Sequence, residues 1–128
     1  MSGPGSDRSV GGVVVRSPGG LRFVPATVAL RVLPMPQRVR VPGAPASLLG
    51  VALVDGEAVP LVDFGAHGEA LLLCTYHGEG LGLANVEVVA TGRFEPDGAD
   101  AVTVEGARVP YFDFPAIVEH VQSGRWAV

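Results

Sequence analysis

Four side chains that could hold a metal or act as nucleophiles lie within thirteen residues: His67, Cys74, His77 and Glu79. Two residues separate Cys74 from His77, but no second Cys-x-x-Cys or His pair completes a tetrahedral zinc site. Cys74 lies inside the apolar run 71–76, where cysteine usually packs as a small hydrophobic residue. Burial there also argues against a Cys–His nucleophile, and no orienting group is evident. We expect neither a metal site nor a catalytic residue in this segment.

Two aspartates at matching positions, Asp63 and Asp113, could form a carboxylate pair for acid–base chemistry. Each ends an apolar stretch and precedes a phenylalanine, which is more typical of a cap or a turn acceptor. Residues 78–82 (GEGLG) contain Gly-x-Gly, but no helix follows to complete a phosphate-binding loop. The sequence therefore predicts a protein that is not an enzyme and that needs no cofactor.

The elements that carry these aspartates are two copies of one β unit. Residues 51–64 (VALVDGEAVPLVDF) and 101–114 (AVTVEGARVPYFDF) are identical at six of fourteen aligned positions. Each copy is an apolar strand, a tight acidic-Gly turn and a second apolar strand. Asp-Gly between apolar runs is a strong hairpin signal, because glycine accepts a positive φ. Two copies are too few for a solenoid, so we expect two packed barrels or sheets, with Val59 and Val109 both buried.

The rest of the chain also favours short strands. Apolar runs bounded by turn residues predict strands at 13–16, 21–24, 71–76, 81–84 and 86–91. Residues 27–33 fit either one helical turn or a strand. Pro60 and Pro110 each remove a ladder donor, so both should lie at sheet edges or bulges. A helical pattern appears only after the second repeat, with apolar residues at Phe114, Ile117, Val118 and Val121.

Length and composition are those of one compact domain with a real core. The chain has 128 residues, of which 48% are hydrophobic and 17% charged, so composition does not predict disorder. We expect a flexible tail at 1–10, one domain in two β lobes at 11–122 and a second tail at 123–128. A single cysteine excludes an internal disulfide and fits a reducing cytoplasm. No apolar run approaches the roughly 18–20 residues that span a bilayer.

Charge is divided unevenly along the chain. Residues 8–54 contain six arginines and no acidic residue, whereas residues 55–128 carry a net charge of −9. This polarity fits docking on a charged partner, and it fits equally a solvated face. The arginines are scattered, no recognition helix is visible and the whole chain is acidic, so nucleic acid is not an expected partner.

Residues 29–64 resemble the middle of CheW-like domains, the adaptor modules of bacterial chemosensory arrays. The likeness is carried by Pro42-Gly43-Ala44-Pro45, Gly50-Val51, Gly56 and the strand end at 59–64 (VPLVDF). Gly82-Leu83 and residues 109–114 resemble later parts of the pattern, so the likeness extends over residues 11–122. The resemblance implies an all-β fold of two intertwined five-stranded SH3-like barrels with a short C-terminal helix. The internal repeat supports this fold independently.

The resemblance also implies a function. A CheW-like domain is a non-catalytic adaptor that couples a methyl-accepting chemoreceptor to a CheA-type sensor histidine kinase by contact alone. It implies a cytoplasmic protein recruited to membrane-associated receptor arrays without inserting into the membrane. The partner-binding residues that it implies are Ala29, Leu30, Arg31, Val32, Leu53 and Asp55. The alternative is a small β-barrel domain that binds a ligand or serves a structural interaction outside chemosensing.

Two departures from the family pattern are reciprocal. Arg31 stands where the family commonly has Glu, and Asp55 stands where it commonly has Arg. The inversion predicts that the two side chains face one another, or face one partner of opposite sign. The resemblance places both positions around the groove that receives the receptor tip. We therefore expect receptor recognition to be altered or lost.

Overall fold

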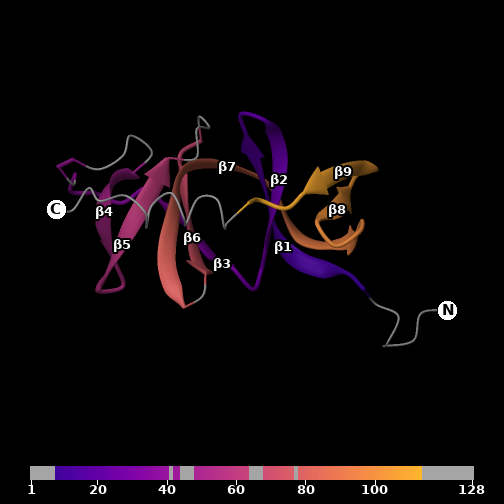
Figure 1. Ribbon diagram of the computed structural model, residues 1–128, viewed down its shortest axis with the longest axis horizontal. Coiled ribbons are helices and arrows are strands. Elements are labelled where there is room, and N and C mark those ends of the chain that lie inside the picture. The colour runs from indigo at the N-terminus through magenta and orange to yellow at the C-terminus, as the bar shows by residue number, and fades with distance from the viewer. Residues whose placement is uncertain (1–7, 41, 44–47, 64–67, 77, 114–128) are drawn as a thin grey trace.

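The computed structural model describes residues 8–40, 42–43, 48–63, 68–76 and 78–113, apart from the side chains of Leu30 and Tyr76. These residues form nine β-strands and no helix (Figure 1). The helix predicted after residue 113 lies outside the described residues. The strands are β1 Val10–Ser17, β2 Gly20–Pro25, β3 Ala29–Pro34, β4 Leu48–Val54, β5 Glu57–Asp63, β6 Ala70–Tyr76, β7 Glu79–Pro96, β8 Ala101–Val104 and β9 Ala107–Pro110.

The strands build two intertwined five-stranded barrels that share one strand. Barrel A contains β1, β2, β8, β9 and the second half of β7, and barrel B contains β3 to β6 and the first half of β7. A parallel bridge between Phe23 and Tyr111 links β2 to the segment after β9 and closes barrel A. In sequence order, the described strands of barrel A come from the beginning and the end of the chain, and the strands of barrel B come from the middle. In space the two barrels lie side by side (Figure 1).

A bulge at Asn85 allows β7 to serve both barrels. Before it, Leu83 packs in the core between the barrels and Ala84 in the core of barrel B. Asn85 has a φ of 61°, and the pairing with β6 shifts register here, so Val86 again faces the core between the barrels. The segments predicted as strand at 81–84 and 86–91 are both strand, and they belong to the one strand β7. Asparagine tolerates the left-handed conformation, and the chain forms a bulge without breaking the strand.

Three apolar clusters hold the barrels together. One fills barrel A, one fills barrel B, and the largest lies between them. Strand β6 contributes to two of them in alternation, because successive strand residues point to opposite faces. Leu71 and Leu73 enter barrel B, whereas Leu72 and Cys74 enter the core between the barrels. This double burial explains the uninterrupted apolar run at 71–76.

The repeated hairpins are equivalent in register. Val51 pairs with Pro60 in barrel B, and Ala101 pairs with Pro110 in barrel A, at the same distance from the turn. In an antiparallel hairpin, hydrogen-bonded and non-hydrogen-bonded residue pairs alternate, starting with the hydrogen-bonded pair that closes the turn. Both proline pairs fall at non-hydrogen-bonded positions, so neither proline needs an N–H to bond across its hairpin. Pro110 lies on an edge strand, as predicted, whereas Pro60 occupies the last position before β5 begins to pair with β7.

The two turns also share one backbone conformation. Asp55 and Gly56 have φ angles of 51° and 81°, and Glu105 and Gly106 have 49° and 83°. Positive φ at both central residues defines a type I′ turn, which matches the twist of a two-residue hairpin. Val59 and Val109 are both buried, at 4% and 2% exposure. The sequence prediction of two equivalent β units is confirmed.

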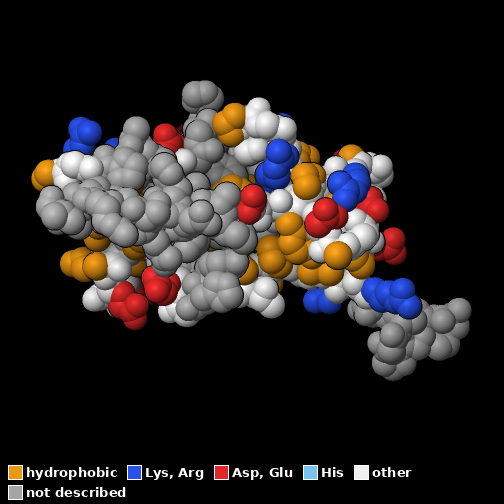
Figure 2. Space-filling model, viewed as in Figure 1, with side chains coloured by type: hydrophobic (Ala, Val, Ile, Leu, Met, Phe, Trp, Pro, Cys, Tyr) orange, Lys and Arg blue, Asp and Glu red, His pale blue; other side chains and the backbone are white. Residues whose placement is uncertain are grey.

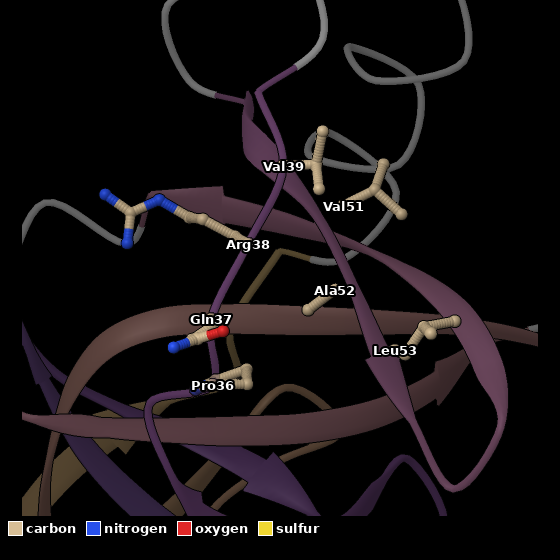
Figure 3. Close-up of a pocket in the computed structure, with 7 residues that line it drawn as sticks. All are labelled: Pro36, Gln37, Arg38, Val39, Val51, Ala52 and Leu53. Atoms are coloured by element: carbon tan, nitrogen blue, oxygen red, sulfur yellow. The ribbon is translucent and has the colours of Figure 1, made fainter.

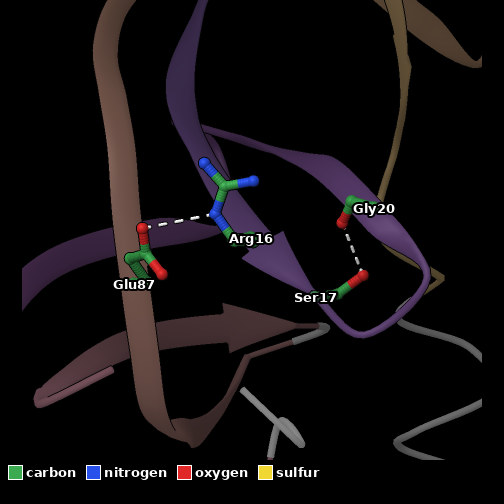
Figure 4. Close-up of polar contacts among 4 residues, drawn as sticks. All are labelled: Arg16, Ser17, Gly20 and Glu87. Carbon is green, nitrogen blue, oxygen red and sulfur yellow. Dashed lines mark hydrogen bonds and ion pairs between the residues drawn. The ribbon is translucent and has the colours of Figure 1, made fainter. Parts of the chain in front are cut away.

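Polar contacts at the surface tie β1 to its neighbours (Figure 4). The Nε of Arg16 donates to Oε2 of Glu87 on β7 at 3.2 Å, and the hydroxyl of Ser17 donates to the carbonyl of Gly20 at 2.7 Å. The first contact links barrel A to the shared strand, and the second closes the predicted first hairpin. Both are exposed, so each is expected to contribute only about 0–1 kcal/mol to stability. No helix within the described ranges is long and apolar enough to cross a membrane.

Candidate interaction surface

Of the side chains that suggested chemistry, those that the structure describes form no metal-binding group. Cys74 is fully buried, and burial raises the pKa of its thiol to about 12. Such a thiol stays protonated at neutral pH and is a poor nucleophile or metal ligand. Among the described residues, no three His, Cys, Asp or Glu side chains are grouped as metal ligands. His67 and His77 lie outside the described residues.

Asp63 and Asp113 belong to different barrels. Asp63 is the last residue of β5 in barrel B, and Asp113 follows β9 of barrel A. Both side chains are exposed, and each makes a polar or electrostatic contact. Their interpretation as caps or turn acceptors stays a prediction.

Arg31 and Asp55 meet, as the reciprocal charge inversion predicted. Arg31 lies on β3, and Nη2 of its guanidinium donates to Oδ2 of Asp55 in the turn between β4 and β5. Their side chains are 46% and 72% exposed. The pair therefore spans the boundary between β3 and β4 in barrel B while both side chains remain open to solvent. Strand β3 pairs with β6 only, so in the described part of the chain no strand ladder joins β3 to β4.

The apolar residues implied by the resemblance divide into exposed and covered positions. Leu53 on β4 is 74% exposed and Val32 on β3 is 44% exposed. Ala29 is half-buried and packs against the core between the barrels, so it offers little surface to a partner. Leu30 lies on β3, and its side chain is outside the described part of the structure. Of this set, Val32 and Leu53 are the apolar side chains shown to be available.

A groove beside β4 was missed at the sequence level. It has a volume of about 600 Å³ and is lined by Pro36, Gln37, Arg38, Val39, Val51, Ala52 and Leu53 (Figure 3). We call it the β4 groove. Val39 is 74% exposed, which makes it as accessible as Leu53. The only signal in the sequence was the alternation Arg38-Val39-Arg40, which indicated extended chain but no partner strand.

Main-chain bonds at one end of the β4 groove hold its two walls together. The N–H of Val39 donates to the carbonyl of Val51, and the N–H of Val51 donates back, both at 2.8 Å. Gly50 permits this approach. Its φ is 151°, and a β-carbon there would lie 2.5 Å from the carbonyl oxygen of Val39. Beyond this single bridge the two walls separate, and the groove opens towards Pro36 and Leu53 (Figure 3).

Among the described residues that line the β4 groove, one is cationic and none is anionic. Arg38 lines it, and Arg40 follows directly after Val39. Both guanidinium groups are exposed, and neither forms an ion pair with another described residue. Arginines 16, 31 and 108, in contrast, are each bonded to a carboxylate. In Figure 2 hydrophobic and arginine side chains both appear at the end of the molecule where Figure 1 places β4.

The interior of barrel B leaves little space for a small ligand. It is filled by the buried side chains Ala52, Val59, Leu61, Leu71, Leu73 and Ala84. A pocket at its mouth, lined in part by Asp55, Glu57 and Gly80, has a volume of only about 210 Å³. Sites for drug-sized molecules usually enclose about 300–1,000 Å³. The accessible features of barrel B are thus external: the Arg31–Asp55 pair, exposed Val32 and the β4 groove.

Comparison with known proteins identifies the fold. The chain is similar to the scaffolding protein TtCheW from Thermoanaerobacter tengcongensis, whose crystal structure matches it with a TM-score of 0.65 and 12% sequence identity. The match covers 89% of this chain and 90% of that chain. It confirms the predicted all-β fold of two SH3-like barrels. No family model and no curated protein matches the sequence.

Proposed function

We propose that this protein is a non-catalytic, cytoplasmic adaptor of a chemosensory-like signalling pathway, which couples a CheA-type histidine kinase to a chemoreceptor-type protein. The observation that carries the proposal is the exposure of apolar side chains on barrel B, with Val39 and Leu53 together in the β4 groove and Val32 on β3. Exposed apolar groups at one site are typical of protein interfaces. The fold that it shares with a scaffolding protein supports the same class of function.

The charge pattern supports a specialised receptor preference. Arg31 and Asp55 bond to one another, so an approaching side chain must compete with, or complement, an existing ion pair. Charges at an interface act mainly on specificity, because a like charge brought close to either residue is repelled. A receptor suited to the usual family charges would meet the opposite sign at both positions. We therefore propose that this adaptor accepts a receptor of altered charge pattern or none.

Binding measurements with separate partners test the proposal. The full chain would be mixed with the regulatory domain of a CheA-type kinase from the same genome, and with a receptor cytoplasmic tip, in sedimentation-velocity experiments. A stable complex with the kinase domain is expected. If neither partner binds at concentrations of tens of micromolar, the adaptor function is wrong, and a structural interaction domain outside chemosensing is favoured.

Matched substitutions locate the surface. Leu53→Asp should weaken the kinase or receptor complex at least about tenfold while changing the free energy of unfolding by no more than ~0.5 kcal/mol, because Leu53 is 74% exposed. Val89→Asp is the control, since Val89 is also exposed but lies on the part of β7 in barrel A. Leu30→Asp is expected to weaken binding in the same way. Equal losses at Leu53 and Val89 would contradict this assignment.

A further inference from the structure

The two barrels differ in how far the outer edge of the repeated hairpin is paired with a neighbouring strand. In barrel A the N–H of Asp97 donates to the carbonyl of Ala101, and β7 continues so that Glu95 pairs with Thr103. In barrel B the matching contact is Val39 with Val51. The next rung would pair Gln37 with Leu53. Leu53 is the residue of the first repeat that corresponds to Thr103 in the second. That rung is not formed, and the β4 groove opens in its place.

The main chain of Leu53 faces this missing rung. Residues 54 and 57 close the type I′ turn, so Leu53 and Ala58 form a non-hydrogen-bonded pair within the hairpin. The N–H and carbonyl of Leu53 therefore point away from β5, on the same edge that Val51 uses to bond Val39. Within the described residues no backbone group pairs with Leu53 on that edge. An unpaired strand edge of this kind is a template for an added strand.

Barrel A shows which chemistry suits such a strand. The segment of β7 beside β8 is Phe94-Glu95-Pro96, followed by Asp97, which combines an aromatic ring with two carboxylates. Beside β4 the exposed side chains that the structure describes are apolar Val39 and Leu53, polar Gln37 and cationic Arg38, and none of the described lining residues is acidic. The charge of the β4 groove therefore complements an acidic segment, and its apolar walls complement a hydrophobic side chain.

We infer that the β4 groove docks an extended, acidic segment of a partner protein, which adds a strand to the edge of β4 at Leu53. The added segment would exchange main-chain hydrogen bonds with Leu53, place a carboxylate near Arg38 and rest an apolar side chain on Val39. Strand addition of this kind obtains affinity from main-chain bonds and specificity from side-chain pockets. The inference rests on the proposed function only in taking the partner to be a protein, and it concerns how that partner is held.

A peptide titration followed by amide NMR tests this mode. The probe is a capped synthetic peptide with the sequence of residues 92–97 (GRFEPD), added to the isotopically labelled full chain. Saturable shifts are expected at the amides of Leu53 and Val39 and at the Nε of Arg38. Arg38→Glu should weaken binding about tenfold or more, as loss of a charge-assisted bond at a binding site does. Arg22→Glu on β2 of barrel A is the control and should bind normally.

A second peptide separates strand addition from charge attraction. N-methylation at the glutamate that corresponds to Glu95 removes the N–H which would donate to Leu53, while every charge is kept. This peptide should lose binding about tenfold. Equal binding of both peptides would overturn the inference. Shifts at Thr103 in place of Leu53 would also overturn it, because the peptide would then be replacing β7 beside β8.

Two other results of the titration would also overturn strand addition at Leu53. Concentration-dependent shifts at Leu53 without peptide would mean that a second copy of the chain occupies the β4 groove, and they would overturn the inference. An absence of shifts at millimolar peptide would do the same. Because the kinase and receptor measurements are independent of this titration, a kinase complex that forms without any Leu53 response would refute strand addition alone. Peptide binding without kinase or receptor binding would refute the chemosensory function alone.

Discussion

The guanidinium of Arg31 on β3 is bonded to the carboxylate of Asp55 at the tip of the β4–β5 hairpin, twenty-four positions along the chain. The contact joins two strands that do not pair with one another in the described part of the structure. Exposed apolar side chains lie on the same two strands, Val32 on β3 and Leu53 on β4. Because both side chains are largely exposed, we expect the pair to contribute little to stability, and we predict that it acts on partner recognition.

Exchange of the two charges tests that placement. Arg31→Glu alone sets two carboxylates against one another, Asp55→Arg alone sets two guanidinium groups together, and the double variant restores an attractive pair. We expect a coupling free energy of about 0–1 kcal/mol by urea denaturation, with both single variants less stable than the double variant. The coupling should shrink in 1 M salt. Strictly additive effects would show that the contact carries no energy, and unchanged receptor preference in the double variant would refute its role in specificity.

The two hairpin turns should respond alike to loss of glycine. Gly56 and Gly106 have φ angles of 81° and 83°, and a β-carbon at either would meet nothing within 4 Å. Gly56→Ala and Gly106→Ala should therefore each cost about 1–2 kcal/mol of unfolding free energy, from backbone strain alone. Gly80→Ala is the control, since its φ is not positive and its nearest neighbour would be an ordinary 3.7 Å away. A cost at Gly80 equal to that at the turns would contradict the argument.

The bulge at Asn85 sets which residues of β7 face which core. Asn85 is the extra residue of the bulge, so its deletion would restore regular alternation after Ala84 and leave Val86 facing the core between the barrels, while removing the local bend. We expect the deletion variant to keep the same residues in each core but to have a lower free energy of unfolding, because β7 loses the bend at which it passes from one barrel to the other. Asn85→Gly keeps the bulge, because glycine adopts a φ of 61° without strain, and should fold with nearly unchanged stability. A deletion variant as stable as the wild-type protein would show that the bulge is dispensable.

Burial of Cys74 predicts a dependence of stability on alkaline pH. Burial raises the pKa of the thiol from 9.0 to about 12, so the folded protein keeps a proton that the unfolded chain releases above pH 9. Stability that the neutral thiol provides is complete below pH 9 and is lost as the pH rises towards 12. The slope should approach ~1.4 kcal/mol per pH unit.

The matched control for that measurement is Cys74→Ala, which should lack this component of the pH dependence. It should also be less stable at neutral pH by about 1–2 kcal/mol, because the substitution removes a buried sulfur. Thiol reagent at pH 8 should label the wild-type protein only when it is unfolded. Rapid labelling under native conditions, or parallel pH profiles for the two proteins, would contradict burial of the thiol.

Local chemistry made part of this fold predictable from sequence. Asp55-Gly56 and Glu105-Gly106 specify their turns through the conformations of adjacent residues, so both hairpins and their registers could be inferred. The run at 71–76 suited a strand buried on both faces, and it lies in β6, where residues 71–74 are buried. The approach of Arg31 to Asp55 followed from comparison with a family pattern and could not have been derived from either residue alone.

Tertiary structure alone decided how the units are joined. Whether Asn85 ends a strand or forms a bulge depends on how the residues on either side of it pack in the two barrels. The sequence next to Asn85 does not determine that packing. The β4 groove likewise depends on where residues 36–39 meet a strand more than ten positions further along. Turn geometry is a property of adjacent φ and ψ angles. The pairing of distant strands depends on which faces are already covered, and only the assembled cores of the two barrels determine this.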